Sequence, residues 1–78
     1  MKYTKYHEAA HTYFHQTLHY YFTGKITYRE FRKDVFKAVG NHRYSEAWIE
    51  LADIAMHSSS VRDYETRVAN NFAEIVYA

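Results

Sequence analysis

Helix-breaking residues are almost absent from this 78-residue chain, which contains no proline and two glycines, Gly24 and Gly40. Proline ends or kinks helices and glycine weakens them, so the stretches without either are free to be helical. Apolar residues recur at spacings of three and four, and no stretch sustains the alternation of a strand. The pattern predicts an all-α fold, a compact bundle of four short helices at about residues 4–22, 28–39, 45–57 and 61–76, in a single domain of residues 1–78.

The predicted helix boundaries rest on capping residues. Gly24 is placed to end the first helix in a left-handed conformation, and Gly40 is placed to end the second in the same way. Thr27 and Glu30 match the S/T-x-x-E capping box at the start of the second helix. Ser60, three residues before an aspartate, resembles the cap of the fourth helix.

The third predicted helix is apolar around most of its circumference, which predicts a place in the middle of the bundle. The other three helices have one apolar side each. The predicted inward residues are Tyr6, Ala10, Tyr13, Phe14, Thr17, Leu18 and Tyr21 on the first helix; Tyr28, Phe31, Val35, Ala38 and Val39 on the second; Tyr44, Ala47, Trp48, Ile49, Leu51, Ala52, Ile54, Ala55 and Met56 on the third; and Val61, Tyr64, Val68, Phe72 and Ile75 on the fourth.

Aromatic residues exceed what so small a core can hide. The chain has nine Tyr, five Phe and one Trp, and each such side chain can bury roughly 150–250 Å². We therefore expect some tyrosines at the surface, where aromatic side chains are favoured in contacts with partners.

Four histidines, His7, His11, His15 and His19, follow one another at four-residue steps along the first helix. Each step turns roughly 40° beyond a full revolution, so the imidazoles form a slowly winding ladder. We expect this ladder on the polar side of the helix, away from the core.

The segment His7-Glu8-Ala9-Ala10-His11 resembles the H-E-x-x-H motif of the zincin metallopeptidases. By this resemblance, His7 and His11 would bind zinc and Glu8 would activate a water molecule. The chain lacks the glycine and the third histidine that follow the motif in metzincins, and no strand is predicted to hold a substrate. We therefore expect no catalytic residues. His7, His11 and His15 remain an alternative as a non-catalytic Zn²⁺ or Ni²⁺ site, because histidines at i,i+4 can chelate a metal; apart from it, no cofactor is expected.

Charge is divided along the chain. Residues 1–43 hold eight Lys/Arg against three Asp/Glu, a balance of +5, and residues 44–78 hold two against six, a balance of −4. In the basic half, the second helix gathers cations around an aromatic residue. Together with two tyrosines of the first helix, this face supplies the predicted partner-binding residues: Tyr20, Tyr21, Arg29, Arg32, Lys33, Phe36 and Lys37.

The second and third helices also suggest a helix-turn-helix, and a nucleic-acid-binding domain is the other alternative. The bulky Phe36 occupies the tight-packing position before Gly40. The would-be recognition helix exposes Glu46, Glu50 and Asp53, which repel phosphate. Sequence-specific DNA binding is therefore not expected.

These features predict a non-enzymatic interaction module that docks on a larger protein or nucleoprotein complex, with homodimerisation as a second mode. In size and polarised charge the chain resembles, as a type, the accessory or inhibitor proteins of phages and plasmids. No apolar run is long enough to span a bilayer, no leader segment is recognisable, and cysteine is absent. We expect a cytoplasmic protein, in the host cytoplasm if a phage encodes it.

Overall fold

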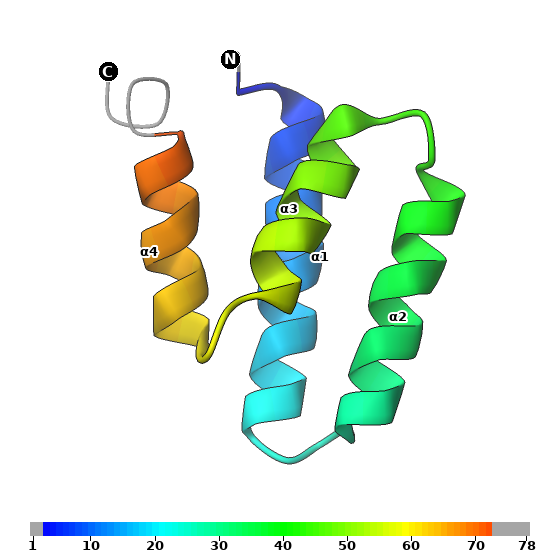
Figure 1. The fold of residues 1–78 in the computed structure, drawn as a ribbon, viewed down its shortest axis with the longest axis vertical. Helices are drawn as coiled ribbons and strands as arrows, with labels where there is room; N and C mark the ends of the chain where they lie inside the picture. The colour runs from blue at the N-terminus through cyan, green and yellow to red at the C-terminus, as the bar shows by residue number, and fades with distance from the viewer. Residues whose placement is uncertain (1–2, 73–78) are drawn as a thin grey trace.

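The computed structural model describes residues 3–72, which form four α-helices and no strand. They are α1 (Lys5–Phe22), α2 (Tyr28–Asn41), α3 (Glu46–Met56) and α4 (Val61–Asn71). Connected by short turns (Figure 1), they confirm the predicted all-α bundle. The end of the fourth predicted helix, with Ile75, lies outside the described residues.

The two central helices are α1 and α3, and the flanking helices are α2 and α4. Each central helix contacts all three others, whereas α2 and α4 do not contact each other within residues 3–72. Figure 1 shows α3 lying across α1, with α2 and α4 on opposite sides. The predicted central place of the third helix is therefore confirmed, and α2 keeps an outer side that no other described helix covers.

The predicted start of α2 and the predicted end of α1 are confirmed in detail. Gly24 has a φ of 81°, and the N–H groups of Gly24 and Lys25 donate to the carbonyl oxygens of Tyr21 and Tyr20. This pair of bonds is a Schellman motif. At the start of α2, the Glu30 N–H donates to the Thr27 hydroxyl, and the Thr27 N–H donates to the Glu30 carboxylate.

The prediction that Gly40 ends α2 in the left-handed region is wrong. Gly40 lies inside the helix, which continues to Asn41, and Gly24 is the one glycine with positive φ. The chain leaves α2 at His42, whose ring stacks on Trp48 with centroids 3.8 Å apart. The exit is therefore fixed by a contact with α3 rather than by a glycine.

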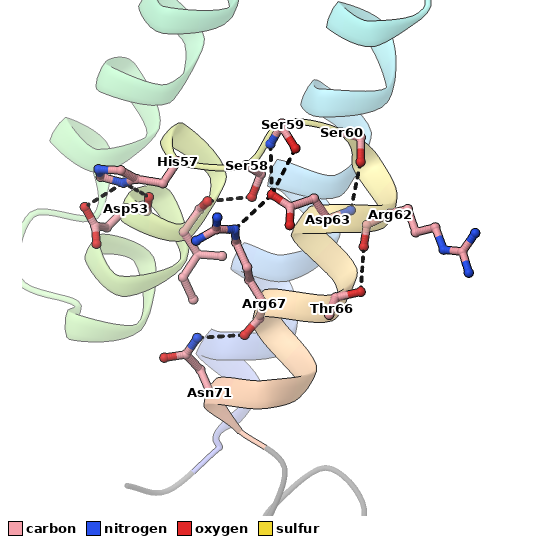
Figure 2. A network of polar contacts seen from close by, with 11 residues as sticks. Asp53, His57, Ser58, Ser59, Ser60, Arg62, Asp63, Thr66, Arg67 and Asn71 are labelled. Atoms are coloured by element: carbon pink, nitrogen blue, oxygen red, sulfur yellow. Dashed lines mark hydrogen bonds and ion pairs between the residues drawn. The ribbon is translucent and has the colours of Figure 1, made fainter.

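The turn from α3 to α4 is organised by Asp63 (Figure 2). Its N–H donates to the Ser60 hydroxyl, as the predicted cap requires, and its carboxylate accepts from the Ser59 N–H and from Arg67 Nε, both at 2.9 Å. The Ser59 N–H and the Arg67 side chain hold the pKa of Asp63 below its ordinary value. The turn is thus closed by hydrogen bonds within α4 and its cap.

The core is formed by residues from all four helices, and most of the predicted inward positions are buried. Five predicted inward residues are exposed instead: Tyr6, Tyr13, Tyr28, Tyr44 and Ile49. Four of them are tyrosines, which periodicity counts as apolar although the hydroxyl group favours water. The predicted presence of surface tyrosines is thereby confirmed, at positions that the pattern had assigned to the core.

Candidate functional site

The side of α2 that faces away from the core carries two exposed aromatic side chains and two arginines. Tyr28, Arg29, Arg32 and Phe36 line a shallow cavity of about 400 Å³; we call these four residues the α2 outer face. Tyr28 is 49% exposed and Phe36 is 58% exposed. Successive four-residue steps turn by roughly 40°, so the positions 28, 32 and 36 move from the rim of the core towards solvent.

Phe36 and Arg32 contact each other within this face. The Arg32 guanidinium carbon lies 5.5 Å from the centroid of the Phe36 ring, within the range of a cation–π contact. The contact orders both side chains while leaving the ring largely in solvent. Phe36 is therefore not packed against α4, which lies on the opposite flank and does not contact α2.

Tyr28 is supported on its core side by Tyr21. The Tyr21 ring stacks on Phe31 of the core, with centroids 5.2 Å apart, and its centroid lies 5.6 Å from that of Tyr28. Tyr21, a predicted contact residue, is half-buried and supports the face rather than lining its cavity. Tyr20, also predicted, does not line it either; its ring lies beneath the Lys25 amine, 5.3 Å away.

Of the predicted partner-binding residues, Arg29, Arg32 and Phe36 thus come together in one cavity. Lys33 and Lys37 are exposed on the same helix but do not line the cavity. Tyr28 was missed, because its position at the edge of the apolar stripe favoured burial. Its place at the first position of α2, before the helix is enclosed by its neighbours, was the signal available in the sequence.

The Lys and Arg residues of the basic half differ in their pairing from the carboxylates of the acidic half. Within residues 3–72, none of the seven Lys and Arg residues between positions 5 and 43 forms an ion pair. The acidic half is different, because four of its carboxylates are paired: Glu50 with His7, Asp53 with His57, Asp63 with Arg67, and Glu65 with His15. The Lys and Arg side chains of the basic half are therefore not held by carboxylates of the described residues.

The prediction that the histidine ladder lies away from the core is wrong for His7, His11 and His15 and is confirmed for His19. His7 is only 6% exposed, His11 and His15 are half-buried, and His19 is exposed. The roughly 40° turn per step carries the ladder from the core at His7 to solvent at His19. The error came from centring the apolar side of the helix on tyrosines that are exposed.

His7 is built into the start of α1. The Thr4 N–H donates to His7 Nδ1 at 3.0 Å, so Nδ1 is the acceptor and the proton of a neutral ring is on Nε2. Nε2 faces Glu50 Oε2 at 3.5 Å, and the ring packs against Tyr3 and Phe72. His7 therefore caps α1 and lies beside Glu50 of α3.

The next two ladder positions connect α1 to α4. His11 Nδ1 lies 3.1 Å from the hydroxyl oxygen of Tyr64, and His15 Nε2 lies 2.7 Å from Glu65 Oε1. Burial lowers the pKa of His11, and the neighbouring His15 lowers it further, while Glu65 acts in the opposite direction. Burial likewise raises the pKa of Tyr64.

These contacts leave the three histidines poorly placed to share one metal ion. His7, His11 and His15 turn ring nitrogens towards three different partners, and within residues 3–72 no three His, Asp or Glu side chains are grouped as a metal site requires. Glu8, the base implied by the resemblance to zincins, is exposed. The geometry of the described residues gives the metal-binding hypothesis no support.

A second cavity, of about 500 Å³, lies where the start of α1 meets the turn between α2 and α3. Its lining includes Tyr6 and Tyr44, which is 88% exposed, and the Arg43 guanidinium carbon lies 5.0 Å from the Tyr44 ring centroid. This corner repeats the combination of arginine and exposed aromatic ring, so it is the surface with which the α2 outer face is compared.

No described helix is long and apolar enough to cross a membrane. Comparison with protein-family models, with curated proteins and with solved structures finds no match to this chain.

Proposed function

We propose that this protein is a non-enzymatic helical interaction module that docks on a larger macromolecular partner through the α2 outer face. The observation that carries the proposal is the exposure of Tyr28 and Phe36 beside two arginines in one cavity. Aromatic residues and arginine are enriched where interfaces derive most of their binding energy. Covering the two rings would release about 25 cal/mol for each Å² of apolar surface removed from water.

The proposed partner is a larger protein or nucleoprotein complex, and the proposed setting is the cytoplasm. This assignment follows the resemblance in type to accessory or inhibitor proteins of phages and plasmids. A docking function needs a rigid helix face rather than a catalytic cleft. The support for such a face is that α2 is held by α1 and α3 on its inner side, whereas no other described helix covers its outer side.

The test compares two matched double variants in an affinity recovery from lysate of the source cells, followed by quantitative mass spectrometry. Arg32→Ala with Phe36→Ala removes the cation–π pair of the α2 outer face, and Arg43→Ala with Tyr44→Ala removes the equivalent pair at the other corner. All four side chains are exposed, so both variants should fold, which circular dichroism checks.

The proposal predicts that proteins recovered by the wild type are lost with the first variant and retained with the second. Retention with both variants would contradict docking by either surface. Loss with the second variant alone would move the docking surface to the corner between α2 and α3.

A further inference from the structure

The arginines of the α2 outer face form no ion pair in the part of the chain that the structure describes. Arg29, Lys33 and Lys37 follow one another at i,i+4, and each such pair of like charges opposes the helix by about 0.2–0.5 kcal/mol. No carboxylate of residues 3–72 forms an ion pair with any of them or with Arg32. A binding partner that supplies carboxylates would remove this repulsion.

The cavity is lined by an aromatic residue near each end and by two arginines between them in the sequence. Tyr28 and Phe36 lie eight residues apart on one helix, about 12 Å at 1.5 Å per residue. Arg29 and Arg32 line the same cavity between them. A ligand that fills this space contacts two aromatic residues and two arginines at once.

From this arrangement we propose that the α2 outer face binds an acidic protein segment in which a carboxylate side chain stands next to an aromatic or aliphatic one. This identification of the partner rests on the proposed docking function. The carboxylate is received by Arg29 and Arg32, whose planar guanidinium groups donate hydrogen bonds to its two oxygens. The apolar side chain lies against Phe36 or Tyr28.

A protein carboxylate fits the helix better than a nucleic-acid backbone. Glu30 and Asp34 lie on the same helix among the cations, and a chain of phosphates following α2 would approach them. The formal net charge of the whole protein is only +1, which gives little general attraction for a polyanion. A short acidic segment needs only the two central arginines.

The experiment selects peptides from a displayed random library against the immobilised full-length protein. Two variants then separate the effect of charge from that of side-chain geometry. Arg29→Lys with Arg32→Lys keeps both charges but loses the planar guanidinium groups. Arg43→Ala with Tyr44→Ala is the matched control. The selected peptides are titrated against each protein at low and at raised ionic strength. A fluorescent single-stranded oligonucleotide is titrated in parallel.

The expected result is enrichment of peptides that carry Asp or Glu within one helical turn of an aromatic or aliphatic residue. Binding should fall about tenfold or more in the lysine variant, persist in the control, and weaken as salt is raised. Enrichment without acidic residues, equal binding by the lysine variant, or tighter binding of the oligonucleotide through Arg32 would overturn the proposal. If these peptides fail while the alanine variant Arg32→Ala with Phe36→Ala still loses its cellular partners, the docking function stands and only the partner's chemistry is wrong.

Discussion

His11 and Tyr64 join α1 to α4 by a stacked pair of rings, with centroids 5.3 Å apart and His11 Nδ1 3.1 Å from the Tyr64 hydroxyl oxygen. The hydroxyl also donates to the His11 carbonyl oxygen, so His11 Nδ1 carries the proton of the neutral ring when both bonds form. Tyr64 is fully buried. A histidine that looked like a surface residue is thus part of the packing between helices.

The first prediction is that acid lowers the stability of the fold through His11. Because the pKa of His11 is lowered in the folded protein, the unfolded chain binds a proton first as the pH falls below the ordinary value of 6.5. The contribution of His11 to the free energy of unfolding should therefore stay constant above pH 6.5. It should decrease as the pH falls below that value. Besides His15 and Glu65, the buried Tyr64 faces this ring. Urea unfolding at a series of pH values measures the effect.

The variant His11→Gln should lose part of this dependence on pH, whereas His19→Gln, at the exposed end of the ladder, should keep it. The comparison uses the difference between pH values, so a constant loss of stability in either variant does not affect it. An identical dependence in wild type and His11→Gln would show that another group is responsible.

The second prediction is that the two glycines respond to alanine with opposite sign. Gly24 has positive φ, which alanine adopts only at a cost, so Gly24→Ala should lower the free energy of unfolding by about 1 kcal/mol or more. Gly40 lies in a helix with open space around its Cα, so Gly40→Ala should raise it by about 0.5–1 kcal/mol. Denaturant titration measures both; the same sign for both variants would contradict the assigned backbone conformations.

The third prediction compares two helix caps. The Thr27 hydroxyl accepts the Glu30 N–H, whereas the Ser45 side chain makes no capping bond to α3. Thr27→Ala should therefore cost about 1 kcal/mol of stability, and Ser45→Ala clearly less. Thermal unfolding of the two variants checks this ranking, and equal losses would show that the Thr27 bond contributes little.

Local signals in the sequence were sufficient for the helices and most of their ends. The capping residues Thr27, Ser60 and Gly24 act within one turn of chain, so their roles follow from neighbours in sequence. The end of α2 could not be predicted this way, because it depends on the stacking of His42 on Trp48 across two elements. No residue next to Gly40 in the sequence indicates that contact.

The candidate site was predicted in part for a related reason. Arg29, Arg32 and Phe36 were predicted because a phenylalanine among cationic residues is unusual in the sequence, whatever its angle around the helix. Tyr28 was missed and His7 misplaced because both lie at the border of an apolar stripe, where burial depends on neighbours such as Tyr21 and Phe72. Periodicity fixes the angle of a residue around its helix but not the extent of the helices that cover it.

The fourth prediction concerns zinc. Because the rings of His7 and His11 face Glu50 and Tyr64, adding one equivalent of Zn²⁺ should leave the Tm unchanged. Differential scanning fluorimetry with and without EDTA is sufficient. A zinc-dependent rise in Tm that disappears in His11→Ala would instead support the metal-binding alternative.

The proposed partner covers the α2 outer face. The most direct test of this contact is the backbone ¹H–¹⁵N NMR spectrum of the full-length protein, free and bound to a partner recovered with the wild type. We predict that shifts and line broadening concentrate at residues 28–37, with the amides of α4 nearly unchanged. Changes confined to α4, or to the corner around Arg43 and Tyr44, would contradict it.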